Sequence, residues 1–284
     1  MTALTPERRA ELAAMLADGP AFEAAHPQLA DYLRTTARMP RPADDRLRQA
    51  EDDFDLRLLH YLTGGPSENP YWDIVAPAVS PTQAQLREVN GGSTTPSSRL
   101  RYAQGLLQAT YAYAIPSPET IAWIARTVDG RPVVEIGAGR GYWASQLAEA
   151  GVTLHAYDIH PPGGRAPNTW FPSPNRPDAL FHAVGNLRDL ATADRDNRRQ
   201  PAQHVLLLCW PPAWDHPMSL RALTAYERRG GNHLIYIGET DSNRSATPEF
   251  FQALSTRWTL TDEDPTHVVW QGFHDVAQSW ARTG

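Results

Sequence analysis

The stretch VVEIGAGRGYWASQLAEAGVTLHAYDI, residues 133–159, decides the fold. A short apolar run leads into three glycines at alternate positions, an amphipathic segment follows, and a second apolar run ends at Asp158. This pattern predicts a strand, a tight loop, a helix and a second strand, because glycine lets the backbone turn sharply and approach a ligand. An acid at the end of the second strand can accept hydrogen bonds from ribose hydroxyls. The stretch therefore predicts a site for an adenosine-containing ligand.

Short apolar runs recur in the second half of the chain, and most are separated by helical or irregular crossovers. Continuous apolar runs suit strands buried on both faces, and their alternation with helices predicts a mostly parallel sheet covered on both sides. We expect residues 258–273 to form two antiparallel strands at the end of this sheet. The apolar runs that predict strands lie at 132–137, 152–158, 180–185, 204–210, 233–239 and 267–273.

The first 115 residues carry a helical pattern whose helix starts share one signature. A Ser or Thr precedes a proline at Thr5-Pro6, Ser80-Pro81, Ser117-Pro118 and, later in the chain, Thr247-Pro248. The hydroxyl can cap the helix, and proline needs no hydrogen-bond donor at the first helical position. We therefore predict an N-terminal helical cap over 1–115 and an α/β sandwich over 116–284. The predicted helices cover about 6–17, 44–63, 81–89, 98–112 and 118–127.

The composition narrows the class of protein. A net charge of −6 disfavours a nucleic-acid-binding surface, and 41% hydrophobic residues favour a globular core. The single cysteine, Cys209, excludes an internal disulfide. The sequence shows no signal-peptide pattern and no long apolar run, so we expect a cytoplasmic protein without a membrane partner. The histidines lack companions at metal-ligand spacing, so we expect no metal site.

The glycine spacing separates two kinds of cofactor site. The dinucleotide fingerprint is GxGxxG, whereas Gly137, Gly139 and Gly141 form GxGxG, preceded by Glu135. The order of strand, acid, GxGxG loop, helix, strand and acid resembles motif I of the class I S-adenosylmethionine (SAM) methyltransferases. The resemblance covers the predicted sandwich domain and implies a Rossmann-like fold with a mostly parallel seven-stranded sheet and SAM as cofactor. It also implies that Glu135 and the glycines form the cofactor loop and that Asp158 holds the ribose.

Further cofactor contacts follow from the same resemblance. HAVGN ends the third predicted strand, where the family places residues beside the adenine, so Gly185 and Asn186 are candidates, with a polar turn as the alternative. Tyr142, which opens the helix after the glycine loop, is another candidate.

The segment CWPP, residues 209–212, stands where amine- and amide-methylating members carry a motif such as Asn-Pro-Pro-Tyr. The polar head of that motif is missing here, which argues against nitrogen methylation. Cys209 and Trp210 remain as cofactor contacts, because the face of a tryptophan can stabilise a sulfonium cation. Core packing is the alternative for Trp210.

Candidates for the chemistry flank the predicted crevice. Glu239 follows the fifth predicted strand, and the carboxyl ends of parallel strands face the ligand crevice. Tyr111 and Tyr113 precede the first core strand, where the family's chain passes over the cofactor. Helix residues two apart point to different sides, so one of the two tyrosines faces the site. Trp170, in a long Pro/Gly-rich loop, and Trp214 are candidates for substrate contact. The alternative is core packing against the cap for the tyrosines, a solvated loop acid for Glu239, and disorder for the loop that carries Trp170.

Three functional hypotheses remain. The first is a SAM-dependent methyltransferase of specialised metabolism, because the cap and the acidic charge suit a small-molecule substrate. The second is a SAM-consuming cyclase or lyase, in which the amine of SAM attacks its own Cγ and releases methylthioadenosine and a small-ring amino acid such as azetidine-2-carboxylate. The third is a non-catalytic SAM-fold scaffold, which the intact glycine loop disfavours. The chain is compatible with a homodimer.

Overall fold

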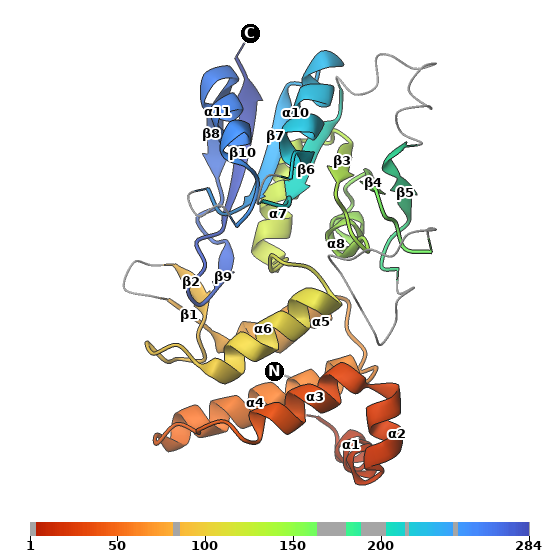
Figure 1. The fold of residues 1–284 in the computed structure, drawn as a ribbon, viewed down its shortest axis with the longest axis vertical. Coiled ribbons are helices and arrows are strands. Elements are labelled where there is room, and N and C mark those ends of the chain that lie inside the picture. Colours follow the sequence, from red (N-terminus) through yellow and green to blue (C-terminus); the bar gives the residue numbers. More distant parts are fainter. Residues whose placement is uncertain are drawn as a thin grey trace. The chain divides into compact units, whose positions relative to one another are not determined.

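The computed structural model describes residues 4–81, 86–163, 180–188, 203–213, 216–240 and 244–283, which fall into two units (Figure 1). The first unit comprises the described residues up to Thr110 together with Trp270–Gly272. The second comprises the other described residues from Tyr111 onward. The division follows the end of helix α6 at Thr110, whereas the sequence analysis placed the domain boundary after residue 115.

The first unit is built from helices that begin at side-chain caps. The Arg8 N–H donates to Thr5 Oγ1 over 3.2 Å, and Asp18 and Asn69 cap two later helices in the same way. Such caps satisfy backbone donors that have no partner within the helix. The largest fully buried side chains here include those of Tyr32 and Tyr71. The helices are α1 (Pro6–Ala17), α2 (Gly19–Ala25), α3 (Pro27–Thr36), α4 (Asp45–Leu62), α5 (Pro70–Val75), the 3₁₀ turn η1 (Ala76–Ala78) and α6 (Ser98–Thr110).

The helix predicted over 81–89 is wrong. Within it, Pro81 belongs to β1 (Val79–Pro81) and residues 87–89 to β2 (Arg87–Val89), and the two strands pair antiparallel with Val79 opposite Val89. Because β1 lies at the edge of a three-stranded sheet of order β1-β2-β9, Pro81 is tolerated there without a backbone donor. The Ser-Pro signature thus marks a strand end here. Trp270, the last residue of β9 (Val268–Trp270), donates from Nε1 to the hydroxyl of Tyr71 over 2.9 Å.

The second unit is a mostly parallel, seven-stranded sheet, as the sequence predicts. Within the described residues its order is β5-β4-β3-β6-β7-β10-β8. The first five strands are parallel, and β10 runs antiparallel to both of its neighbours. The strands are β3 (Val133–Ile136), β4 (Leu154–Asp158), β5 (Val184–Asn186), β6 (Val205–Cys209), β7 (His233–Gly238), β8 (Trp258–Glu263) and β10 (Val276–Arg282).

Helices cover this sheet on both faces, which confirms the predicted Rossmann-like α/β sandwich. The connection from β3 through α8 (Tyr142–Glu149) to β4 runs toward one edge, whereas β6 through α10 (Met218–Arg228) to β7 runs toward the other. Because such crossovers are right-handed, α8 and α10 lie on opposite faces. Helix α7 (Pro118–Val128) packs with α8, and α11 (Pro248–Arg257) packs with α10.

The end of the sheet differs from the prediction. Strand β8 pairs with β10, which the sequence analysis did not predict, and β9 leaves this sheet. The reason lies in the turn after β8, where Asp264 accepts hydrogen bonds from Thr266 N and from the buried Thr120 hydroxyl. Residues Val268 to Trp270 are all buried. The apolar run therefore does form a strand, but that strand belongs to the three-stranded sheet. The predicted strand over 180–185 is reduced to β5.

Candidate active site

The candidate site lies at the carboxyl edge of the parallel strands in the second unit. From β3 the chain winds in one direction to β4 and β5, and from β6 it winds in the other direction to β7. The point between β3 and β6 is therefore the topological switch point, where open α/β sheets bind ligands outside the carboxyl ends of their strands. Residues at these ends include Glu135, Asp158, Cys209 and Glu239.

The glycine loop leaves β3 and folds back onto β4. The N–H groups of Gly137 and Ala138 donate to Tyr157 O over 2.8 and 3.1 Å. Gly137, Gly139 and Gly141 have φ angles of 83°, 57° and 76°, in the left-handed region that favours glycine. The loop is thus held in one conformation at the start of α8.

Two of these glycines also make room for neighbouring side chains. A Cβ on Gly137 would meet Met218 Cε at 2.2 Å, and one on Gly141 would meet His182 O at 3.1 Å. At Gly141 the neighbour includes backbone, so packing favours glycine there, whereas the Met218 side chain beside Gly137 can move and the positive φ angle is what favours glycine. Their predicted cofactor contacts remain predictions.

Asp158 ties the loop to the end of β4. Its Oδ2 accepts from Gly139 N over 2.9 Å, and its Oδ1 accepts from His160 N over 2.8 Å. Each carboxylate oxygen can accept a second hydrogen bond, so this arrangement retains capacity for ribose hydroxyls. The side chain is buried, and both backbone bonds fix its orientation.

Glu135, which precedes the loop, is a buried carboxyl group with one oxygen that has no hydrogen-bond partner among the residues that the structure describes. Only 3% of the residue is exposed, and the oxygen without a partner is Oε2. Burial, with the negative charge of Asp158 adding to it, raises the pKa of this carboxyl to about 8. A buried carboxylate without a partner is costly, so Glu135 is suited to receive a cation or a hydrogen-bond donor.

Aromatic rings gather beside the start of α8. Tyr111 lies with its ring centroid 4.8 Å from that of Tyr142 and 5.8 Å from that of Phe181. Arg140 lies over the Phe181 ring, 5.5 Å from its centroid. Tyr111 is buried, and that burial raises the pKa of its hydroxyl. Phe181 and Arg140 were not singled out from the sequence.

Tyr113 points to a different part of the site. It lies beyond the end of α6, so the two tyrosines are not helix residues as predicted, yet they do contact different neighbours. The Tyr113 ring stacks on Trp210 with centroids 5.7 Å apart and an angle of 18° between planes. Trp210 has a φ of 47°, a strained value for a tryptophan, and its N–H donates to Ile237 O over 2.7 Å.

Two buried acids lie at the ends of β7 and β10. Val276, the first residue of β10, is paired with Gly238, so Asp275 and Glu239 lie side by side at the carboxyl edge. Glu239 Oε1 accepts from Arg244 Nη1 over 3.1 Å and from His274 N over 3.0 Å. Asp275 Oδ2 accepts from Trp210 Nε1 over 2.9 Å. Burial raises the pKa of Asp275 to about 7; the Trp210 hydrogen bond opposes this, and Glu239 adds to it.

Asp275 was missed in the sequence analysis. It precedes β10, whose sequence VAQSWAR mixes small, polar and apolar residues and gives a weak strand signal. Without that strand, nothing in the sequence places Asp275 beside Glu239.

The remaining predicted residues lie as follows. A Cβ on Gly185 would meet the Tyr157 ring at 2.9 Å, so close packing requires glycine there. Asn186 Oδ1 accepts from Arg188 N over 2.9 Å, which is a turn contact. Cys209 ends β6, and burial raises the pKa of its thiol, with the charges of Glu135 and Asp275 adding to the effect. Trp170 and Trp214 lie outside the described residues.

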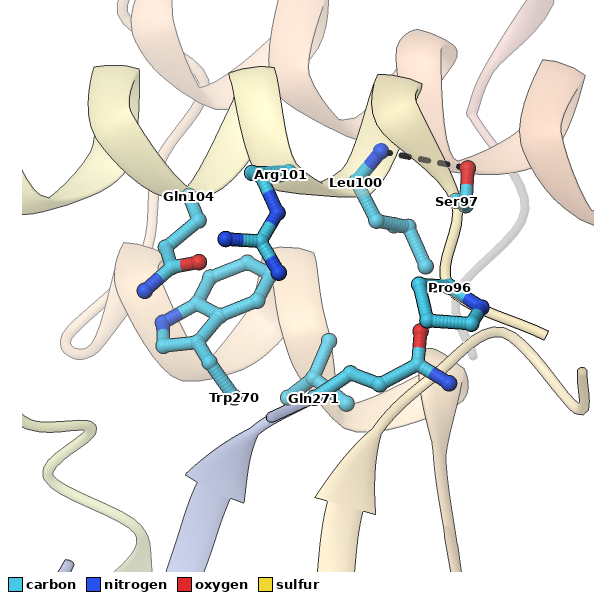
Figure 2. Close-up of a pocket in the computed structure, with 8 residues that line it drawn as sticks. Pro96, Ser97, Leu100, Arg101, Gln104, Trp270 and Gln271 are labelled. Atoms are coloured by element: carbon cyan, nitrogen blue, oxygen red, sulfur yellow. Dashed lines mark hydrogen bonds between the residues drawn. The ribbon is translucent and has the colours of Figure 1, made fainter. Parts of the chain in front are cut away.

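A small pocket is found in the first unit. Figure 2 shows it between α6 and the end of β9, lined among others by Arg101, Gln104 and Trp270. The Leu100 N–H donates to Ser97 Oγ at one side of it, over 3.3 Å. The site residues predicted from the sequence that the structure describes all belong to the second unit.

Two further observations concern metals and membranes. Among the residues that the structure describes, no three His, Cys, Asp or Glu side chains are grouped so as to hold a metal ion. In that same part of the chain, no helix has the length and apolar character needed to span a bilayer.

Comparison with known proteins gives likenesses in structure alone. No protein-family model and no curated protein matches the sequence. Among solved structures, the Synechocystis magnesium protoporphyrin IX methyltransferase with bound SAM is 10% identical, with a TM-score of 0.34, over 67% of this chain and 87% of that one. The CcbJ methyltransferase of Streptomyces caelestis is 13% identical, with a TM-score of 0.34, over 58% and 89%.

A third similar structure is the 1,6-didemethyltoxoflavin-N1-methyltransferase of Burkholderia thailandensis with S-adenosylhomocysteine bound. It is 16% identical, with a TM-score of 0.34, over 72% of this chain and 95% of that one. These identities and TM-scores are low, so the likenesses by themselves do not show what this chain does.

Proposed function

We propose that this protein is a SAM-dependent methyltransferase that acts on a small molecule. The observation that carries the proposal is the pair of buried acids at the glycine loop, Glu135 and Asp158. Asp158 suits the ribose of any adenosine-containing ligand, whereas the buried Glu135 suits the ammonium group of SAM and offers nothing to a pyrophosphate. Glu135 Oε2, which has no hydrogen-bond partner among the described residues of the protein, can accept a hydrogen bond from the ammonium group of a bound SAM.

Two further residues at the carboxyl edge of the sheet, Asp158 and Trp210, are also suited to contact SAM. Asp158 is held by Gly139 N and His160 N with lone pairs left for the ribose, as in other adenosine-binding α/β sheets. The face of Trp210 offers a surface that attracts cations. When bound, SAM supplies an activated methyl group, and the chain's own residues then have to align an acceptor with it and exclude water.

Mass spectrometry of the purified protein incubated with SAM alone tests this proposal against its main competitor. The proposal predicts that SAM stays unchanged without an acceptor and that S-adenosylhomocysteine (SAH) binds with a stoichiometry of one. Methylthioadenosine formed from SAM alone would replace methyl transfer by the ring-forming or lyase reaction. Absence of both turnover and SAH binding would leave the scaffold hypothesis.

The variant Asp158→Ala tests the ribose contact in the SAH-binding measurement, with Glu149→Gln as its matched control. It removes the acceptor of two backbone N–H groups and of the proposed ribose contact, so SAH binding should be lost. Glu149→Gln, an exposed change on α8 in the same unit, should bind SAH as the wild type does.

A further inference from the structure

Asp275 is a buried acid to which the proposed cofactor site assigns no contact. It is 8% exposed, and its Oδ1 atom has no hydrogen-bond partner, while Oδ2 is held by Trp210 Nε1. An unsatisfied buried carboxyl oxygen costs free energy, so its presence calls for a physical reason. The Trp210 contact accounts for one oxygen only. The second oxygen is available for a ligand.

The position of Asp275 places it next to the proposed cofactor site but not within it. Along the carboxyl edge the order of strands is β3, β6, β7 and β10, so Glu135 and Asp275 are separated by the ends of β6 and β7. Both carboxyl charges act on the Cys209 thiol, which ends β6 between them. An acceptor bound at Asp275 would therefore lie further along the same edge from the glycine loop.

Two aromatic rings contact Trp210, whose indole N–H holds Asp275. The Trp210 ring stacks on Tyr113, and the Phe273 ring lies 5.9 Å from it. Trp210 is held in its strained conformation by its backbone bond to Ile237 and its indole bond to Asp275. Strain of this kind persists where the surrounding structure fixes a functional side chain. Trp210 lies beside the Asp275 carboxyl, and an aromatic ring beside a carboxylate can bind an ammonium group.

None of the charged groups that the structure describes around Asp275 hydrogen-bonds to its Oδ1 atom, so this oxygen can bind an ammonium group. Glu239 raises the pKa of Asp275 and Arg244 lowers it. Further titratable groups along this edge include Tyr236, Cys209, Glu135, Asp158 and His274. Arg244 is already bound to Glu239, and its guanidinium lies over Phe273, 4.8 Å from the ring centroid.

We propose that Asp275, Trp210 and Tyr113 form the acceptor subsite and that the methyl acceptor is an amine whose nitrogen binds Asp275 Oδ1. This inference rests on the proposed function and narrows its substrate class. It also replaces the expectation that the missing Asn head of the CWPP segment argues against nitrogen methylation, because the acceptor oxygen comes here from the start of β10.

The chemistry of this subsite balances. A substrate ammonium gives one proton to the Asp275 carboxylate, which becomes a neutral acid. The freed nitrogen lone pair forms a bond to the methyl carbon while the carbon–sulfur bond breaks and its electron pair stays on sulfur, giving SAH. The product leaves as a methylated ammonium, and Asp275 releases its proton to solvent. A pKa of about 7 suits a group that must take up and release a proton near neutrality.

Binding of simple amines to the SAH-saturated protein tests this inference without knowledge of the natural substrate. The probes are ethylamine and 2-phenylethylamine, each compared with the alcohol of the same carbon skeleton, by calorimetry or by ligand-observed NMR. We expect the wild type to bind at least one amine about tenfold or more tightly than its alcohol, because a charge-assisted hydrogen bond contributes that much. Equal binding of amine and alcohol would overturn the inference.

The variant Asp275→Asn isolates the charge, because an asparagine Oδ1 can still accept from Trp210 Nε1. We expect it to lose the preference for amines while its SAH affinity stays within about twofold of the wild type. Amine affinity should rise from about pH 6 to about pH 8 in the wild type and stay flat in Asp275→Asn, since only the ionised carboxyl attracts the ammonium.

A role limited to holding the Trp210 ring predicts no change in either readout for Asp275→Asn, and that result would overturn the inference. Glu149→Gln, an exposed change on α8, provides the matched control. It should keep the preference for amines. If the wild type binds no SAH, the proposed function fails, whereas SAH binding without amine selectivity defeats only the acceptor subsite.

Discussion

Replacing Glu135 by glutamine should stabilise the ligand-free protein in a pH-dependent way. Burial raises the pKa of this carboxyl from 4.5 to about 8. Below pH 4.5 the group is protonated in both the folded and the unfolded chain and has no effect on stability. As the pH rises from 4.5 to 8, the unfolded chain ionises first, so the wild type loses stability. Above pH 8 the loss is constant.

The size of this loss follows from the same shift. Each pKa unit corresponds to about 1.4 kcal/mol, so the full penalty above pH 8 is on the order of 5 kcal/mol. Glu135→Gln removes this penalty but leaves an amide with its own unmatched hydrogen-bonding groups, at a cost of about 1–3 kcal/mol that does not depend on pH. The slope of the stability difference with pH is therefore the decisive quantity.

Urea unfolding of the wild type, Glu135→Gln and the exposed control Glu149→Gln at about pH 5.5, 7 and 8.5 measures that slope. The difference between Glu135→Gln and the wild type should grow by several kcal/mol across this range. The control should follow the wild type. A stability difference that is the same at every pH would refute the assignment of Glu135 as a desolvated carboxyl.

The same variant should respond in the opposite way to the cofactor. At a SAH concentration of about 100 Kd, the wild type gains about 2.7 kcal/mol of stability by mass action. Glu135→Gln loses the charge of the proposed ammonium partner, so it should bind SAH about 10- to 100-fold more weakly. A gain in stability together with a loss of ligand affinity is what a functional carboxylate predicts, and a structural one does not.

Three further changes test other contacts of the second unit. Asp158→Asn replaces one of two acceptors of backbone N–H groups and should lower the free energy of unfolding by about 1–3 kcal/mol, measured by urea titration. Gly141→Ala should cost more than Gly151→Ala, because both have positive φ angles but only the first is closely packed; equal melting temperatures would contradict this. Thr120→Val removes the buried hydrogen bond to Asp264 and should destabilise the protein by about 1–3 kcal/mol, again by urea titration.

The local pattern around the glycine loop was predictable from the sequence because its elements are short and directly connected. Strand β3, the loop, α8 and β4 follow one another within the 27 residues of the opening stretch, so their hydrophobic pattern and their glycines specify the structure locally. The helix starts at Pro6 and Pro118 follow from the same local chemistry.

The rest of the site depends on pairing between distant segments. Strand β10 pairs with β7 and β8. Its own sequence, which mixes Ala, Gln, Ser and Trp, does not predict a strand. Asp275 enters the site only through that pairing. Ser80-Pro81 shows the converse, because a local helix signal gave way to the pairing of Val79 with Val89.

Calorimetric titration of the wild type with SAH and, separately, with NAD⁺ tests the central claim most directly. A site formed by Glu135, Asp158 and the GxGxG loop should bind one SAH per chain and no NAD⁺, because Glu135 accepts the ammonium group of SAH and NAD⁺ carries no such group. Binding of NAD⁺ in preference to SAH, or of neither by the folded protein, would contradict it.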